Sequence, residues 1–126
     1  MSLDVTSIKY PTYEHVIWLY DRVVEISDGG IKGFRDEGEL LYVLEAIKND
    51  DYFPNFISRL AFIIHRVCDG HIFKDGNKRM GLALGGLFLQ LNRLYKSNMM
   101  YIQRMESITY HIAAGNINST LLTKVL

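Results

Sequence analysis

One stretch near the middle of the chain, HIFKDGNKRM from His71 to Met80, combines most of the residue types that phosphate chemistry uses. Histidine is the only residue type in it that exchanges protons near neutral pH, so His71 is the candidate general base. Asp75 is a candidate Mg²⁺ ligand, because Mg²⁺ in proteins usually takes one or two carboxylates together with phosphate oxygens and water. Each of these residues alone also has an ordinary structural explanation, in a turn or beside a helix.

The second half of the same stretch is suited to bind an anion. Its periodicity predicts a helix that begins at Asn77, where unpaired N–H groups and the positive end of the helix dipole lie. Gly76 leaves room for an anion near the backbone, and Lys78 and Arg79 add positive charge. Asn77 can orient a phosphate or the backbone, and Phe73 is expected to point inward as the structural anchor of the loop. Together these residues fit phosphoryl-type transfer to a hydroxyl, but composition alone leaves the structural interpretation equally open.

Length and charge limit the class of protein. The chain has 126 residues, 48% of them hydrophobic, and its 14 acidic and 14 basic residues give a formal net charge of zero. We therefore expect one domain over residues 1–126 and no direct nucleic-acid partner. Cys68 is the one cysteine, which favours a reducing compartment, and the longest nearly apolar run, Met80 to Leu91, is too short to span a membrane. Without a signal-peptide pattern, the expected location is cytoplasmic.

The apolar spacing is helical almost throughout and predicts an all-α compact bundle of about six helices. The predicted helices cover residues 12–27, 36–48, 55–68, 77–94, 103–114 and 119–125. Asp36 and Glu39 have the spacing of a capping box at the start of the second helix. The helix from Asn77 is apolar nearly all round, so we expect it to be the central one.

Several side chains are assigned to the core from this pattern. In the second helix the expected buried residues are Leu40, Leu41, Val43, Leu44 and Ile47. Trp18 and the tyrosines are expected in the core or at its rim, although Tyr42 or Tyr52 could stack on a nucleotide base. Glycines 81, 85 and 86 are expected to let neighbouring helices approach closely.

These motifs resemble a known family. HIFKDGNKR matches the Fic/Doc signature HxFx(D/E)GN(G/K)R at every defined position, and GGIKGFRDEGEL, residues 29–40, is similar to the GG-x-x-G-x-RD-x-x-x-L segment of the death-on-curing (Doc) branch. The resemblance implies a Fic/Doc fold and transfer of part of a nucleotide, with ATP and Mg²⁺, to a hydroxyl of a protein substrate. It implies that His71 deprotonates the target and that Asp75 binds Mg²⁺. The implied phosphate-binding residues are Gly76, Asn77, Lys78 and Arg79, and the implied target-docking flap, residues 28–35, includes Gly29, Gly30, Ile31, Lys32 and Gly33.

Departures from the family pattern distinguish between its activities. Typical adenylyltransferases of the family carry glycine where Lys78 stands and arginine where Leu82 stands. The sequence is instead similar to Doc, whose branch includes a kinase that phosphorylates elongation factor Tu. The first expectation is therefore phosphoryl transfer from ATP, and the alternative is AMP transfer. A degenerate, non-catalytic binding module is a further alternative, because Met80-Gly81 and Tyr20 also depart from the Doc pattern.

The glutamates bear on regulation, because Fic proteins are restrained by a helix with the pattern (S/T)xxxE(G/N). The glutamates at 14, 25, 37, 39, 45 and 106 follow Tyr10, Asp21, Gly33, Arg35, Leu41 and Ile102 by four positions. None of these is serine or threonine, so the resemblance implies a separate antitoxin protein as the controlling partner. The sequence sets no expectation for the oligomeric state.

A metal-dependent hydrolase is the competing enzyme class. His65, Asp69, His71 and Asp75 are close in sequence, and histidine and aspartate clusters bind divalent metals. That interpretation leaves Lys78 and Arg79 unexplained and lacks an HExxH motif.

Overall fold

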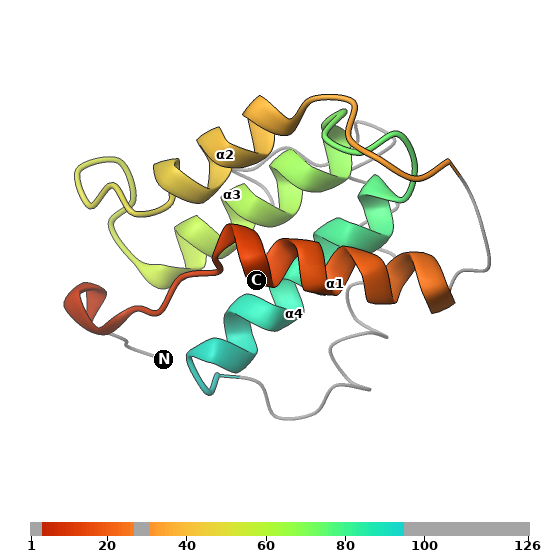
Figure 1. The fold of residues 1–126 in the computed structure, drawn as a ribbon. Helices are drawn as coiled ribbons and strands as arrows, with labels where there is room; N and C mark the ends of the chain where they lie inside the picture. The colour runs from red at the N-terminus through yellow and green to blue at the C-terminus, as the bar shows by residue number, and fades with distance from the viewer. Residues whose placement is uncertain (1–3, 27–30, 95–126) are drawn as a thin grey trace.

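The computed structural model describes residues 4–26 and 31–94, and these residues are organised as helices. The elements, in chain order, are a short 3₁₀ helix η1 (Val5–Ser7) and the α-helices α1 (Tyr13–Ile26), α2 (Glu37–Ala46), α3 (Phe56–Asp69) and α4 (Asn77–Leu91) (Figure 1). The described part contains one isolated antiparallel β-bridge, between Phe34 and Phe73. The predicted all-α fold class is confirmed, and the helices predicted over 103–114 and 119–125 lie outside the described residues.

Local sequence signals explain where two of the helices begin. Asp36 is the N-cap of α2, and its Oδ1 accepts a hydrogen bond from the Glu39 N–H at 3.1 Å. Only half of the predicted capping box forms, because the Glu39 carboxylate accepts instead from the Arg66 guanidinium. In α3 the box is complete: Asn55 Oδ1 accepts from the Ser58 N–H at 2.8 Å, and the Ser58 hydroxyl accepts from the Asn55 N–H.

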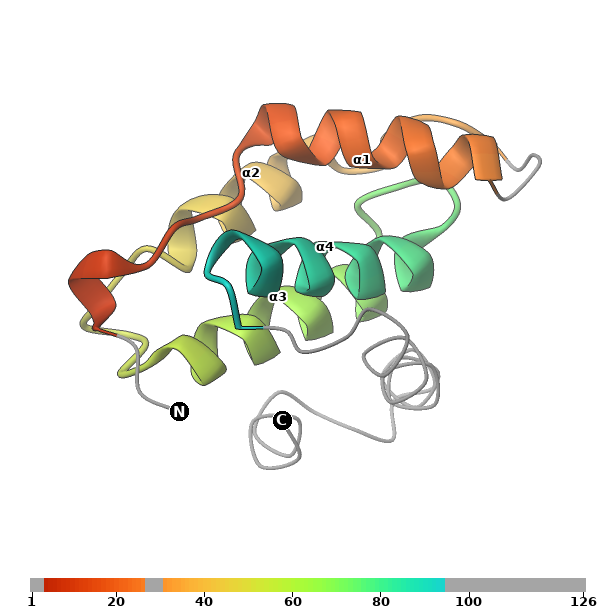
Figure 2. The ribbon, with the colours of Figure 1, turned by 90° about the horizontal axis from the view of Figure 1, so that it is seen from below.

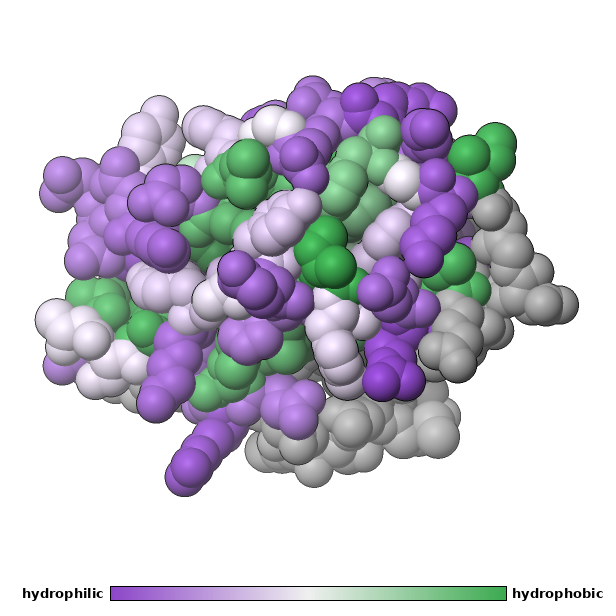
Figure 3. Space-filling view, in the orientation of Figure 1, coloured by the Kyte–Doolittle hydropathy of each residue, from purple (hydrophilic) through white to green (hydrophobic). Residues whose placement is uncertain are grey.

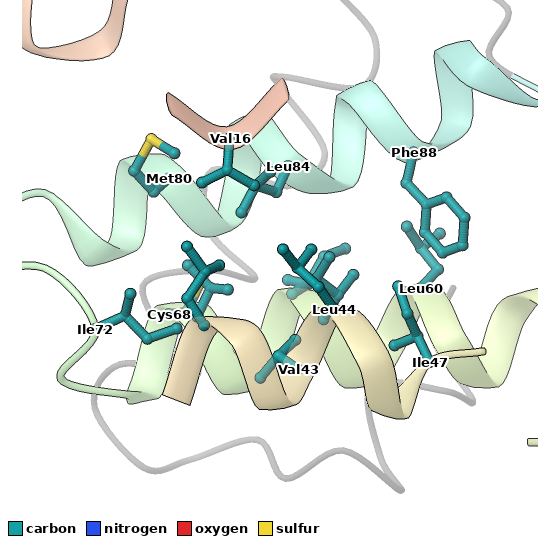
Figure 4. Packing of buried hydrophobic residues seen from close by; sticks show 14 of the residues in the cluster. Val16, Val43, Leu44, Ile47, Leu60, Cys68, Ile72, Met80, Leu84 and Phe88 are labelled. Atoms are coloured by element: carbon teal, nitrogen blue, oxygen red, sulfur yellow. The ribbon is translucent and has the colours of Figure 1, made fainter. Parts of the chain in front are cut away.

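The helices pack in layers around α4. Figure 2 shows α4 between α1 and α3, with which it makes its main contacts, while α2 lies alongside α3 in Figure 1. Leu84 and Phe88 point from α4 toward α3 and α2, where they meet side chains such as Leu44 and Leu60 (Figure 4). The central place predicted for this helix follows from its largely apolar surface. No helix in the described residues has both the length and the apolar character needed to cross a membrane.

Four side chains that the sequence assigned to the core or its rim are exposed: Leu41, Trp18, Tyr42 and Tyr52. Leu41 is 49% exposed, because α2 turns Leu40, Val43 and Leu44 inward and Leu41 lies on another side of the helix. Trp18 is 59% exposed, because it lies midway between the buried Val16 and Tyr20 on α1 and so projects from the opposite face. Its ring lies under the Arg22 guanidinium at 5.2 Å. On the face shown in Figure 3, hydrophobic side chains form several separate patches among hydrophilic ones.

A buried arginine, not foreseen from the sequence, holds the connection between α2 and α3. The Arg59 side chain is fully buried and donates to the backbone carbonyls of Ile47 and Phe53 at 2.8 and 2.7 Å. It also pairs with Asp50 at 2.9 Å and donates to the Tyr10 hydroxyl at 2.8 Å. Because a buried charge is tolerated only when it is paired and hydrogen-bonded, Arg59 fixes the path of this connection.

The contact between α3 and α4 depends on the absence of a side chain at Gly81. A Cβ atom there would lie 2.2 Å from the Cys68 Sγ, 3.1 Å from the Cys68 backbone N and 3.2 Å from the Ile64 carbonyl oxygen. For Gly81, the predicted role in close helix packing is therefore confirmed. The same contact buries the Cys68 thiol, and burial raises the pKa of Cys68 to about 12.

Replacing Gly81 by alanine should destabilise the protein by about 1–3 kcal/mol, because the added methyl group overpacks the α3–α4 contact. Gly38→Ala is the matched control, since a Cβ at Gly38 would meet only the Asp36 Oδ1 at an ordinary 3.4 Å. For that variant the higher helix propensity of alanine predicts a change between zero and a gain of about 1 kcal/mol. Urea unfolding of both variants measures the difference, and equal stabilities would contradict the packing argument.

The Cys68 thiol should not react with a disulfide reagent at pH 8 while the protein is folded, because only the thiolate attacks and burial keeps the thiol protonated. In denaturant it should react at once. Its folded-state pKa of about 12 exceeds the usual 9.0, so the unfolded chain loses this proton first as the pH rises. The free energy of unfolding should therefore fall with pH between these two values. Cys68→Ala serves as the blank for the reagent and should lack that part of the pH dependence.

Candidate functional site

The segment between α3 and α4, residues 70–76 and here named the motif loop, is anchored by a buried aromatic ring. Phe73 is fully buried, and its ring stacks on Tyr20 of α1 with centroids 4.5 Å apart. On another side it stacks on Phe34 at 5.3 Å. His71, two residues earlier in the same loop, is exposed. The loop thus holds its aromatic residue in the core and presents its histidine to solvent.

Asn77 closes the loop through its side chain. Its Oδ1 accepts from the Phe73 N–H at 3.0 Å, and its Nδ2 donates to the Phe73 carbonyl at 2.9 Å. Both ends of the amide are therefore bound to the main chain of one residue. Of the two uses that the sequence suggested for Asn77, the structure shows the side chain in the one that orients the backbone.

The first turn of α4 has the features of an anion site. Gly76 precedes it as N-cap with φ +82°, a left-handed conformation that favours glycine, and a Cβ there would have no atom within 4 Å. Gly76 therefore serves the backbone conformation and leaves open space beside the helix end, which carries no side-chain cap. Lys78 and Arg79 are exposed in this first turn, so positive charge adds to the positive end of the helix dipole.

Asp75 stands immediately before this helix end. Its Oδ1 accepts from the Gly76 N–H at 2.8 Å, and the residue is exposed. This bond fixes the direction of the carboxylate beside the open space, and a carboxylate oxygen is the ligand type that Mg²⁺ prefers. The residue therefore suits the predicted Mg²⁺ ligand, together with phosphate oxygens and water.

The end of the predicted flap pairs with the motif loop. The Lys74 N–H donates to the Gly33 carbonyl at 2.9 Å, and the Arg35 N–H donates to the Ile72 carbonyl at 2.8 Å, on either side of the bridge between Phe34 and Phe73. Ile31 is 69% exposed and Lys32 pairs with Asp21 at 3.5 Å, whereas Gly29 and Gly30 lie outside the described residues. The described part of the flap thus lies directly beside the loop that carries His71.

His71 also lines a pocket of about 370 Å³. The other lining residues come from the start of α2 and the end of α3: Asp36, Glu39, His65, Arg66, Asp69 and Gly70. Arg66 donates to Glu39 through both Nε and Nη2, which neutralises one of the three carboxylates. The candidate base His71 therefore lies beside a pocket wall that carries three carboxylates and one arginine.

The hydrolase interpretation requires a cluster of two histidines and two aspartates, and only part of this cluster lines the pocket. His65, Asp69 and His71 line it, whereas Asp75 is not among its lining residues. Among the residues that the structure describes, no three or more histidine, cysteine, aspartate or glutamate side chains are grouped to hold a metal ion. In the described residues the cluster that the hydrolase interpretation requires is thus only partly brought together.

The two tyrosines considered for base stacking are both exposed. Tyr42 is 55% exposed and packs its ring against the Arg66 guanidinium at 5.5 Å, so it reaches the pocket only through Arg66. Tyr52 is 80% exposed and contacts the ring of Phe53 in the connection between α2 and α3. Tyr20 was not expected in the site, and its ring supports Phe73. The spacing of four residues between Val16 and Tyr20 indicates that both are buried, but it does not predict the contact with Phe73.

The sequence matches a known protein family. The model of the Fic/DOC family matches residues 10–89, more than half of the chain, and the matched range includes the motif loop, the described part of the flap and most of α4. No curated protein matches the sequence significantly.

Asn77→Ala should lower the free energy of unfolding by about 1–3 kcal/mol, because two main-chain groups of Phe73 lose their partners. Asn77→Asp should be destabilised as well, since a carboxylate can accept from the Phe73 N–H but repels the Phe73 carbonyl oxygen. Thermal unfolding of both variants, without nucleotide, measures this structural role. Wild-type stability in both variants would mean that the side chain is available for phosphate instead.

Proposed function

Because the chain belongs to the Fic/DOC family, whose members are transferases that act on protein hydroxyls, we propose that it transfers a phosphoryl group from ATP to a hydroxyl of a protein substrate. The observation that carries this proposal is the arrangement around the motif loop. An exposed histidine precedes a helix end that combines a left-handed glycine, a directed carboxylate and two exposed cations.

Each residue of this arrangement has one task in the proposed reaction. His71 takes the proton of the target hydroxyl, the hydroxyl oxygen forms a bond to the γ-phosphorus, and the bond from that phosphorus to the β,γ-bridging oxygen breaks, so that ADP leaves. The main-chain N–H groups of the first turn of α4, with Lys78 and Arg79, hold the phosphate oxygens. Asp75 would hold Mg²⁺, which supplies charge neutralisation between the phosphates when bound.

The charges around His71 suggest where each substrate binds. Asp36, Asp69 and the Arg66-paired Glu39 line the pocket, and their charge disfavours phosphate there. The cations and the helix dipole favour phosphate at the start of α4. We therefore assign the nucleotide to the start of α4 and the hydroxyl-bearing side chain of the target to the pocket side of His71.

Lys78 and Leu82 support phosphoryl transfer over AMP transfer. The resemblance described above associates AMP transfer with glycine and arginine at these two positions. In the structure Lys78 adds an exposed charge to the first turn of α4, and Leu82 packs against the core, so it provides no cation for the nucleotide tail. The Doc-like branch is accordingly the part of the family to which we assign the chain.

The same resemblance suggests two partners. The proposed target class is a translation factor such as elongation factor Tu, docked along the flap, and the proposed regulator is a separate antitoxin that covers the site. A well-tolerated, active protein isolated without any partner would contradict the proposed antitoxin.

Incubation with Mg²⁺ and ATP should move the γ-phosphate label, and not an adenine label, onto a protein of a ribosome-free lysate. His71→Ala should reduce the rate by at least roughly 100-fold, the usual contribution of general base catalysis. Gel separation of the lysate after each labelling measures both transfers in parallel.

His15→Gln is the matched control, since His15 lies outside the pocket and its side chain accepts a hydrogen bond from the Thr12 N–H. It should transfer at the wild-type rate. Transfer of the adenine label would establish AMP transfer instead. Nucleotide binding without transfer of either label would establish the non-catalytic binding module.

A further inference from the structure

The hydroxyl of Tyr20 contacts the flap at one defined point. It accepts a hydrogen bond from the Gly33 N–H at 2.8 Å and lies 3.4 Å from the Gly33 carbonyl oxygen. Tyr20 is 4% exposed, so this hydroxyl is shielded from water and its hydrogen bond is not easily exchanged for one to solvent. Gly33 has φ +124°, a conformation that side chains rarely adopt.

The ring of the same tyrosine supports the motif loop. It stacks on Phe73 at 4.5 Å, and Phe73 is the residue whose main chain Asn77 holds on both sides. One side chain of α1 therefore touches the flap with its hydroxyl and the loop that carries His71 with its ring. The flap and the loop are also joined by the stacking of Phe34 on Phe73 and by backbone hydrogen bonds of residues 33–36 with residues 72 and 74.

We propose that Tyr20 is a positioning residue for the protein substrate, which sets the place of the flap relative to His71. The proposal rests on the proposed function in one respect, namely that the flap docks the target. Tyr20 does not line the pocket, so it acts through Gly33 and not on the reacting atoms. Loss of its hydroxyl should loosen the flap, while the loop, its histidine and the start of α4 keep their places through the ring and through Asn77.

The test compares Tyr20→Phe with Tyr13→Phe. The first variant keeps the ring and removes the hydroxyl, which accepts from the Gly33 N–H and donates to the Gly33 carbonyl. The second is a matched control on the same helix. The Tyr13 hydroxyl donates to Glu37 at 2.6 Å and not to Gly33, and the variant keeps the ring that stacks on Phe34. Both variants should remain folded, as measured by circular dichroism and thermal unfolding.

Amide hydrogen exchange at Gly33, followed by NMR, is the first measurement because it does not require any enzymatic activity. In Tyr20→Phe this exchange should accelerate by roughly 10-fold or more, whereas exchange at Phe73 should stay as in the wild type. In Tyr13→Phe both should be unchanged. An unchanged rate at Gly33 in Tyr20→Phe would overturn the proposal, whatever the protein transfers.

Steady-state kinetics is the second measurement. The KM for the protein target should rise roughly 3- to 10-fold in Tyr20→Phe, the effect of one neutral hydrogen bond, with kcat and the KM for ATP close to wild type. A fall in kcat with an unchanged target KM, or an equal effect of Tyr13→Phe, would overturn the positioning role. If the wild type transfers no label, the proposed function fails, and the exchange at Gly33 still decides whether Tyr20 tethers the flap.

Discussion

The burial of Phe73 is the contact on which the rest of the site depends. Its ring packs against both Tyr20 and Phe34, whose rings also contact each other, and this brings α1, the segment before α2 and the motif loop to one place. Once this ring is fixed, the neighbouring main chain is fixed as well, because Asn77 binds both polar groups of the same residue. The exposed His71 and the start of α4 then have defined positions relative to each other.

Stability and chemistry are assigned to different residues in this small protein. Arg59 and Gly81 serve the framework: the first satisfies buried carbonyls in the connection between α2 and α3, and the second lets α4 lie against Cys68. His71, Asp75 and Arg79 are exposed and contribute little to packing. This separation is typical of sites in which groups meant for a ligand are placed by a rigid scaffold and not by one another.

The sequence predicts the four described α-helices well, and it identifies the loop and the helix start that carry the candidate site residues, because both depend on local patterns. The capping residues Asp36 and Asn55 and the glycine at position 76 each act within a few positions of the chain. Contacts between distant segments were not predictable in the same way. Nothing in the local pattern indicates that Arg59 would be buried or that the Tyr20 hydroxyl would meet Gly33. Trp18 and Leu41 were misplaced because hydrophobicity alone does not say which side of an amphipathic helix a residue occupies.

Within the loop that Asn77 closes, Lys74 contributes to the fold only through its main chain, with its N–H bound to the Gly33 carbonyl. Its side chain is exposed and passes close to Gly33, 3.7 Å from where a Cβ of that glycine would be. The residue type at this position is therefore free to vary without any change in loop closure. A substitution here would change the charge beside the flap and leave the backbone hydrogen bond to Gly33 and the closure by Asn77 in place.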